Sequence, residues 1–163
     1  MIVRPSTYAD VPRLMEIYRQ ARQIQLDSGN LHQWHEGFPP ESLVRSDIEN
    51  GWGYVIEDEG RIAGVFAFVP GADATYRSIE GGRWLDDTRP YCTIHRLGGT
   101  KCSHGVASAC FEWCFSHADN VRVDTHEDNS IMRHCIEKAG FRYCGRIRLL
   151  NGDPRIAYQK LLF

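Results

Sequence analysis

From residue 91 onwards the chain alternates between two hydrophobic periodicities, one of two residues and one of three to four. The shorter period is typical of strands and the longer one of helices. The predicted elements are a strand over 91–97, a helix over 103–118, a strand over 120–124, a helix over 128–139, and strands over 141–146 and 155–162. Strands joined through a helix are parallel and follow a right-handed crossover. The sequence therefore predicts an α/β sheet that contains parallel strands.

The first seventy residues predict a helix and a hairpin that pack with this sheet. A short β-prone run at 2–4 precedes Thr7, where a capping-box spacing with Asp10 predicts the start of a helix. Two β-rich runs, 52–57 and 61–69, flank an Asp-Glu-Gly turn and predict a hairpin. The helix carries one apolar stripe, made of Val11, Leu14, Ile17, Tyr18, Ala21 and Ile24.

Two irregular stretches, 27–41 and 70–89, interrupt these elements. The first is rich in Gly, Pro, His and Trp and leads into a short helix predicted at 41–49. The second is longer than an ordinary connection, as expected of a segment that shapes a binding wall. We expect both stretches to border one cleft and to determine its specificity.

Length and composition favour one folded domain over residues 1–163. Hydrophobic residues make up 42% of the chain and charged residues 25%, which is ordinary for a globular protein. The formal charge of −2 provides no basic face for nucleic acid. No stretch approaches the roughly 18–20 apolar residues of a membrane helix, and the N-terminus lacks the apolar segment of a signal peptide. We expect a cytoplasmic monomer or homodimer without nucleic-acid or membrane partners.

The six cysteines are interpreted as reduced thiols, because secreted disulfide scaffolds are usually shorter and richer in cysteine. None forms a CxxC pair, and Cys110 and Cys114 fall on the apolar stripe of their helix, where cysteine acts as a small hydrophobic residue. His32 and His35 have no accompanying carboxylate or cysteine cluster. No metal site is therefore expected.

The loop between the strand at 91–97 and the following helix is the segment most informative about function. Backbone N–H groups and the positive end of the helix dipole meet where the loop enters the helix. Gly105 has no side chain and Ala107 a small one, so a pyrophosphate can approach the backbone, with Lys101 adding positive charge. Glycines that only turn the chain are the alternative. The sequence contains neither GxxxxGK(S/T) nor GxGxxG after its first strand, which excludes a P-loop and counts against a Rossmann fold.

The order of elements and two motifs resemble small bacterial members of the GNAT superfamily of N-acetyltransferases. Residues 102–107 are similar to its pyrophosphate motif (Q/R)xxGx(G/A), with Gly105 and Ala107 at the matching places. Asn129 followed by Glu-Lys-Ala-Gly-Phe at 137–141 resembles its Asn-to-EKxGF segment. The resemblance spans nearly the whole chain. It implies an α/β (α+β) fold with a mixed central sheet of about six to seven strands, helices on both faces, and parallel strands that splay apart at the acetyl-CoA site.

The same resemblance implies transfer of an acetyl group from acetyl-CoA, a co-substrate, to a primary amine of a small molecule or peptide. Two departures from the family pattern favour an alternative, a non-catalytic acyl-CoA-binding or interaction module. Cys102 replaces the usual Gln or Arg, and Ile136 replaces the tyrosine that protonates the leaving thiolate in many members. The implied cofactor-binding residues are Leu97, Lys101, Cys102, Ser103, His104, Gly105, Val106, Ala107 and Asn129.

His95, Tyr91 and Tyr143 are the candidates for proton transfer. In the family the thioester lies beside the strand at 91–97, so a backbone donor near Leu97 is the candidate oxyanion contact. Histidine exchanges a proton near neutral pH, which makes His95 the preferred base. Alternatively, His95 is a hydrogen-bonded sheet residue and the tyrosines serve packing. Unless a bulge intervenes, alternation places on one face Tyr91, Thr93, His95 and Leu97.

Candidate acceptor contacts come from carboxylates and aromatic rings. Asn129 is either a helix cap or a donor to the pantetheine arm. Asp124 and Glu127 follow a strand end that faces the cleft, and they either bind an ammonium group or are solvated loop carboxylates. Three aromatic residues either form an acceptor wall or cover the core. They are Trp34, Tyr76 and Trp84.

Overall fold

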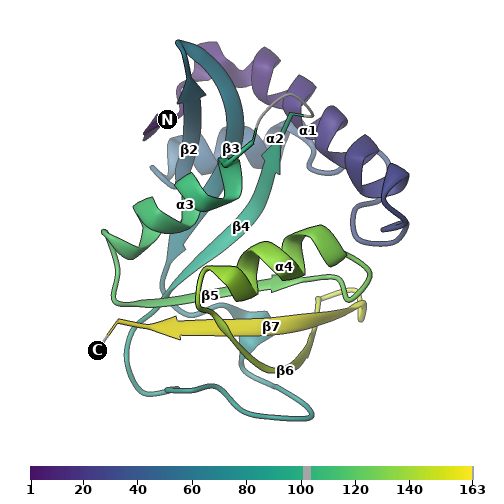
Figure 1. The fold of residues 1–163 in the computed structure, drawn as a ribbon, viewed down its shortest axis with the longest axis vertical. Helices are drawn as coiled ribbons and strands as arrows, with labels where there is room; N and C mark the ends of the chain where they lie inside the picture. The colour runs from purple at the N-terminus through teal and green to yellow at the C-terminus, as the bar shows by residue number, and fades with distance from the viewer. Residues whose placement is uncertain (101–103, 163) are drawn as a thin grey trace.

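In the computed structural model, which describes residues 1–100 and 104–162, seven strands form one mixed sheet in the order β1-β2-β3-β4-β5-β7-β6 (Figure 1). Only β4 and β5 run parallel to each other; every other neighbouring pair is antiparallel. The α/β architecture expected from the sequence is confirmed. The strands are β1 (Ile2–Pro5), β2 (Gly53–Asp58), β3 (Arg61–Pro70), β4 (Cys92–Gly99), β5 (Asn120–Thr125), β6 (Arg142–Arg148) and β7 (Pro154–Leu161).

Helices cover both faces of the sheet. Figure 1 shows α3 and α4 in front of the sheet and α2 behind it. Val55 and Val65 of the β2–β3 hairpin pack with α1 and α2, whereas their neighbours Ile56 and Phe66 pack with α3 and α4. This division follows from the two-residue alternation of strand side chains. The helices of the described residues are α1 (Val11–Asp27), α2 (Glu41–Glu49), α3 (Val106–Phe115) and α4 (Ser130–Lys138), with short 3-10 turns η1 (Tyr8–Asp10) and η2 (Ala74–Tyr76).

The N-terminal helix follows the predicted pattern. The Asp10 carboxylate accepts a hydrogen bond from the Thr7 backbone N–H at 2.8 Å, so the capping box forms ahead of α1. The first five residues of the predicted stripe are buried against the sheet. Ile24, the last of them, is half-buried and lines the cleft described below. The C-terminal end of α1 therefore borders the site.

The parallel strands β4 and β5 separate after a short paired stretch. Their register contains three pairs, which end at Ile94 opposite Val123. Beyond Ile94 strand β4 continues to Gly99, where its β5-facing edge borders a cavity instead of another strand. The splayed parallel strands expected from the sequence are thus present.

A bulge in β4 changes the direction of its side chains just beyond the last paired residue. Arg96 has a left-handed backbone with φ of +54°, and the β3–β4 register shifts across this position. Leu97 packs with the core around α3 and α4, whereas His95 faces a carboxylate on the other side of the sheet. The exception stated with the sequence-based expectation therefore applies: a bulge inserts one extra residue, so His95 and Leu97 lie on different faces.

Thiols and charged groups within residues 1–100 and 104–162 form neither disulfides nor metal clusters. The five described cysteines are free, and Cys110 and Cys114 are fully buried in the core, as their place on the helix predicts. In the same residues no group of three or more His, Cys, Asp or Glu side chains could hold a metal ion. None of the described helices is both long and apolar enough to cross a membrane.

Candidate active site

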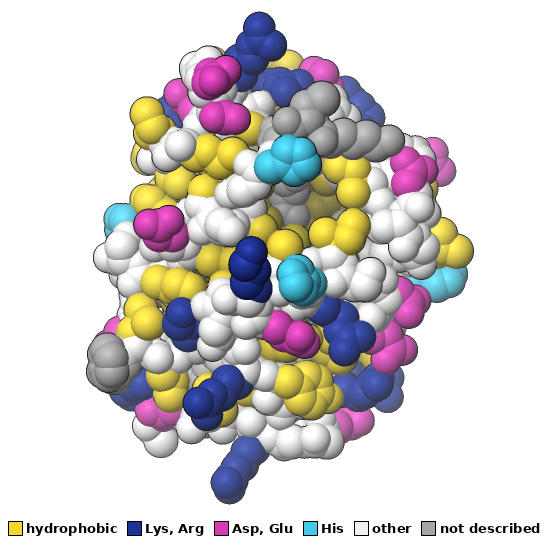
Figure 2. Space-filling view, viewed as in Figure 1, with side chains coloured by type: hydrophobic (Ala, Val, Ile, Leu, Met, Phe, Trp, Pro, Cys, Tyr) yellow, Lys and Arg dark blue, Asp and Glu magenta, His cyan; other side chains and the backbone are white. Residues whose placement is uncertain are grey.

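Two adjoining cavities lie along the splayed part of β4, between the end of α1 and α4. The first has a volume of about 520 Å³ and the second about 580 Å³. Both are bordered by Leu97, Gly98 and Gly99 of β4 and by Ile131 and Met132 of α4. The space-filling view shows a hollow lined by hydrophobic side chains in this region (Figure 2). The two cavities form one elongated cleft with two chemically different ends.

The second cavity ends at the N-terminus of α3. His104, Gly105, Val106 and Ala107 line it, as the sequence predicts for a phosphate site. The N–H groups of the first helical turn have no acceptor inside the helix, and the helix dipole makes this end positive. Gly105 has φ of +86°, a left-handed conformation that disfavours residues with a side chain. Lys101, Cys102 and Ser103, also assigned to the cofactor, lie outside the described residues.

The first cavity holds a charged cluster on the opposite face of the sheet from α3. Ile94 and Val123, the last paired residues of β4 and β5, both belong to the core beneath α3 and α4. The next residues, His95 and Asp124, therefore point to the other face from either side of the splay. Both line the first cavity. The strand register thus places an imidazole and a carboxylate across the mouth of the opening.

Asp73 fixes the orientation of the His95 ring. The Oδ2 atom of Asp73 lies 3.1 Å from Nε2 of His95, and Oδ1 accepts two hydrogen bonds from Thr75. The His95 contact holds the pKa of the Asp73 carboxyl well below its ordinary value. Because a carboxylate only accepts hydrogen bonds, Nε2 carries the proton of the neutral ring. Nδ1 is then the ring nitrogen that can receive a proton.

Asp124 occupies a different electrostatic environment. The hydroxyl of Tyr76 donates to its Oδ2 atom at 2.5 Å. Desolvation by the surrounding protein raises the pKa of the Asp124 carboxyl, and the nearby His95 and Arg155 charges only partly oppose this effect. Within the described part of the chain, no cationic side chain lies within ion-pair distance of Asp124, so a cationic ligand would supply the missing counter-charge.

Asn129 caps α4 and also joins the wall of the cleft. Its Oδ1 atom accepts from the N–H of Met132, and its Nδ2 donates to Oε1 of Gln33 at 2.9 Å. The same Gln33 oxygen accepts from Asn30 and Thr125. Asn129 therefore serves as the helix cap, one of its two expected roles. Its contact with pantetheine stays a prediction.

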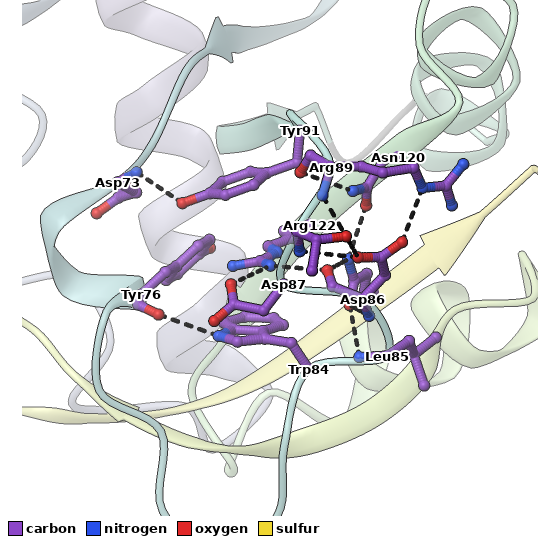
Figure 3. A network of polar contacts seen from close by, with 12 residues as sticks. Asp73, Tyr76, Trp84, Leu85, Asp86, Asp87, Arg89, Tyr91, Asn120 and Arg122 are labelled. Atoms are coloured by element: carbon purple, nitrogen blue, oxygen red, sulfur yellow. Dashed lines mark hydrogen bonds and ion pairs between the residues drawn. The ribbon is translucent and has the colours of Figure 1, made fainter.

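The irregular connection between β3 and β4 is tied to the sheet through Arg122, as Figure 3 shows. Arg122 is only 1% exposed, and its guanidinium lies 3.9 Å from the ring centroids of both Trp84 and Tyr91. Its Nη2 atom also donates to the backbone oxygen of Asp86 and to the side chain of Asp87. This sandwich holds the connection that carries Asp73 and Tyr76 against the site.

Neither tyrosine proposed for proton transfer borders the cleft. Tyr91 precedes β4, and its hydroxyl accepts from the backbone N–H of Asp73 at 2.7 Å. Tyr143 is 51% exposed on β6, where its ring contacts Tyr158. Both placements leave the tyrosines outside the cleft and agree with the packing role, the alternative that the sequence left open. The reason is that Tyr91 turns towards Arg122 and Tyr143 lies on an edge strand.

The expected acceptor wall is only partly assembled. Trp34 lines the first cavity together with Asp124. Tyr76 and Trp84 are buried and do not border it, because their rings pack against each other and Trp84 also stacks on Arg122. Glu127 is exposed and forms an ion pair with Arg146 at 3.0 Å, also outside the cavities. Glu127 is thus a solvated carboxylate and Tyr76 and Trp84 cover the core, which are the alternatives that the sequence left open.

Three residues of the site were not identified from the sequence: Asp73, Gln33 and Arg155. All three line the first cavity. Asp73 and Gln33 lie in the two irregular stretches, where no periodicity indicates direction. Arg155 did carry a signal, because a charged residue introduces the apolar run Ile-Ala-Tyr of β7. A buried charge in a strand is unusual unless it has a partner or a ligand.

Comparison with known proteins bears on this arrangement. The family profile described as "Acetyltransferase (GNAT) domain" matches residues 1–142. The crystal structure of a GNAT-family acetyltransferase from Streptococcus agalactiae 2603 is 30% identical, covers 98% of this chain and 94% of its own, and has a TM-score of 0.90. A search of curated proteins finds no match.

Two more distant structures share the fold. A ribosomal-protein-alanine N-acetyltransferase from Brucella melitensis is 20% identical over 99% of this chain and 100% of its own, with a TM-score of 0.66. The GNAT-like decarboxylase GphF, in complex with isobutyryl-CoA, is 15% identical over 100% of both chains, with a TM-score of 0.68. The family profile and the S. agalactiae structure together lead to one conclusion: this chain belongs to the GNAT family of acetyltransferases.

Proposed function

We propose that the protein transfers an acetyl group from acetyl-CoA to a primary amine of a small molecule or peptide. The observation that carries this proposal is the placement of His95 and Asp124 on opposite sides of the β4–β5 splay, inside a cleft whose other end is a helix N-terminus. One end suits an anionic diphosphate and the other suits an amine. A structural neighbour with the same fold is in complex with isobutyryl-CoA, which supports the choice of an acyl-CoA.

The residues present fit acetyl-CoA along the whole cleft. The first-turn amides of α3 and the side-chain-free Gly105 would hold the pyrophosphate. The unpaired edge of β4 beyond Ile94 would bind the pantetheine arm through backbone groups, with Ile131 and Met132 of α4 excluding water. The backbone N–H of Leu97, next to the bulge, is the proposed donor to the carbonyl oxygen.

The proposed chemistry divides between the two charged groups of the first cavity. Bound acetyl-CoA supplies a thioester, whose carbonyl carbon bonds to the amine nitrogen while its carbon–sulfur bond breaks and the sulfur departs as a thiolate. Asp124 binds the incoming ammonium group. His95 accepts one proton from the ammonium group at Nδ1, directly or through water, while Asp73 holds Nε2–H in place. The second proton leaves the nitrogen after the carbon–nitrogen bond forms and passes through water to the thiolate. General-base catalysis of this kind contributes about 10²–10⁴ in rate.

A non-catalytic acyl-CoA-binding module is the second candidate. Ile136 stands where many family members have the acid that protonates the thiolate, and it is fully buried in the core. Tyr143, the other proposed acid, lies outside the cleft. In an enzyme, water would then protonate the thiolate. Release of free thiol separates the two candidates, because both bind acyl-CoA but only an enzyme consumes it.

The first experiment tests cofactor binding by calorimetry with acetyl-CoA. Replacing Gly105 by Ala should weaken binding about tenfold or more, because the added Cβ strains the left-handed backbone and crowds the phosphate cradle. Gly60→Ala is the matched control: Gly60 has φ of +77° in the β2–β3 turn, with no atom near its Cβ position. The proposed site is supported if the two variants lose similar stability but only Gly105→Ala loses affinity for acetyl-CoA. No heat from acetyl-CoA with the unmodified protein contradicts it.

The second experiment measures thiol release from acetyl-CoA with a panel of primary amines. His95→Gln should reduce kcat by about 10²-fold or more, while the affinity for acetyl-CoA changes little. Asp73→Asn should reduce kcat less than His95→Gln does, because the imidazole ring remains. It should also alter the pH dependence of kcat, because the ring proton is no longer held on Nε2. An unmodified protein that binds acetyl-CoA and acetylates no amine would favour the binding module.

A further inference from the structure

We infer that the acceptor amine also carries a carboxylate, as a free α-amino acid does, and that Arg155 binds this carboxylate while Asp124 binds the ammonium group. The inference rests on the proposed function and names the substrate class of the same site. It depends on the position, burial and bonding of Arg155.

The strand register places the side chains of His95, Asp124 and Arg155 on one face of the neighbouring strands β4, β5 and β7. Asp124 of β5 is paired with Ala157 of β7, so their side chains share a face. Arg155 lies two residues before Ala157 and points the same way. His95 joins them from β4, on the other side of the splay. All of them face away from α3 and α4 and line the first cavity.

Arg155 is a buried cation without an anionic partner. It is 5% exposed, and among the described residues no carboxylate lies within ion-pair distance of it. Two of its nitrogens donate to the backbone oxygens of Pro154 and Gln33, at 2.8 and 2.7 Å. A guanidinium has five N–H groups, so three remain without an acceptor in the described part of the chain. Burying a charge without a counter-ion is costly, and a ligand carboxylate would remove that cost with a bidentate contact.

The carboxylates around Arg155 favour a zwitterion over other ligands. Asp73, Asp124 and Asp153 line the same cavity, and the charges of Asp124 and Asp153 act on Arg155 from beyond ion-pair distance. A purely anionic ligand would meet repulsion from these groups. A simple amine or a polyamine would match them but would leave Arg155 uncompensated. An amine that also bears a carboxylate satisfies both signs of charge.

The spacing of the two groups suits a small molecule of this kind. Asp124 and Arg155 are diagonal neighbours on adjacent antiparallel strands, a relation that separates residues by about 7–8 Å. An ammonium group in contact with one and a carboxylate in contact with the other would therefore lie within a few bonds of each other. Beyond them the cavity is bordered by Trp34, Phe38 and Leu149, which would contact the rest of the acceptor.

The test uses calorimetry with the unmodified protein saturated with CoA, so that no turnover occurs. The twenty amino acids are titrated first. Each amino acid that binds is compared with its amide and with its decarboxylated amine, which keep the ammonium and lose the carboxylate. We expect at least one amino acid to bind about tenfold or more tightly than both counterparts. The inference would be overturned if every amino acid bound no more tightly than its amide and its decarboxylated amine, or if no amino acid bound at all.

Arg155→Gln tests the residue itself. In this variant the ratio of the two dissociation constants, amide over free acid, should fall towards one, whereas Arg142→Gln on the exposed part of β6 should keep the ratio unchanged. A retained ratio in Arg155→Gln would exclude Arg155 as the carboxylate site. The comparison of each amino acid with its amide and its amine uses the unmodified protein, so it still tests the inference if Arg155→Gln misfolds.

Failure of the inference is distinguishable from failure of the proposed function. If simple amines release thiol from acetyl-CoA and amino acids neither bind nor react, the proposed function stands and the inference falls. If acetyl-CoA itself does not bind, both fall.

Discussion

At the scale of single residues, the site keeps a carboxyl group in an environment that opposes its charge. Asp124 receives one hydrogen bond, from Tyr76, and lacks a cation within ion-pair distance in the described residues. Its pKa is raised above the ordinary value because desolvation outweighs these contacts. A group with a raised carboxyl pKa destabilises the folded state wherever it is ionised. An ionised Asp124 therefore costs stability, and it is the proposed contact of the ammonium group.

Replacing Asp124 by Asn should stabilise the fold and impair the reaction. The amide keeps an oxygen for the Tyr76 hydroxyl and removes the buried charge, so Tm at pH 8 should rise by about 2–4 °C for each kcal/mol recovered. The gain should shrink as pH falls towards 4, because the unmodified carboxyl then becomes protonated in the folded state. The KM for the amine should increase about tenfold or more. Thermal unfolding across pH and initial rates provide the two measurements.

Asp58→Asn is the control for this prediction, since Asp58 is exposed at the end of β2. It should change neither Tm nor KM appreciably. A lower Tm for Asp124→Asn at pH 8 would show that the carboxylate contributes more through its contacts than it costs through burial.

At the scale of elements, the bulge in β4 decides which groups face the cleft. His95, just before the bulge, faces Asp73, and the bulge turns Leu97 to the other face, towards the core. Two contacts hold it. The Tyr18 hydroxyl donates to the backbone oxygen of Arg96 at 3.0 Å, and the Arg96 side chain pairs with the buried Asp47 of α2 at 2.7 Å. Helices α1 and α2 thus fix the geometry of a strand that they cover.

Tyr18→Phe should loosen this bulge. The Arg96 oxygen would lose its buried donor, at a cost of about 1–3 kcal/mol, which corresponds to a fall in Tm of about 2–12 °C. Acetyl transfer should fall as well, because the Leu97 N–H would no longer be held in one position. Tyr54→Phe is the matched control, since the Tyr54 hydroxyl makes one long contact of 3.5 Å at the surface. Equal effects of the two changes on Tm and rate would refute a special role for the Tyr18 contact.

At the scale of the whole molecule, one buried cation joins the long β3–β4 connection to the sheet. Arg122 lies between the rings of Trp84 and Tyr91, and Tyr91 in turn accepts the N–H of Asp73 (Figure 3). The Arg122 atoms Nε and Nη1 have no hydrogen-bond partner among the described residues, so stacking dominates their environment. The first cavity, the proposed acceptor end of the cleft, therefore depends on a residue that does not line it.

Arg122→Lys should weaken the acceptor end selectively. Lysine keeps the charge but lacks the planar group that stacks between two rings, and the change should cost about 2 kcal/mol or more. We expect a lower Tm, faster proteolysis within residues 77–90 and a higher KM for the amine, with little change in acetyl-CoA affinity. Arg142→Lys on β6 serves as the control, because Arg142 is exposed. An unchanged KM together with an unchanged rate of proteolysis would refute this role.

The sequence by itself determined the elements and the lining of the second cavity, the proposed cofactor end of the cleft. The bounds of α2 agree with the prediction at 41–49, the stripe of α1 is buried, and His104 to Ala107 line the second cavity. These features are local, because periodicity, caps and a loop that enters a helix all depend on residues close together in the sequence. The sequence also indicated His95 and Asp124, through their places near the ends of predicted strands.

Only the tertiary structure decided how the first cavity, the proposed amine end, is assembled. It brought Asp73 to His95, Tyr76 to Asp124 and Arg155 into the same cavity, and it moved Tyr91 and Trp84 away from the cleft to Arg122. These contacts depend on strand register, on one bulge and on the path of a long connection. Each is set by packing between residues far apart in the chain, which no local pattern encodes.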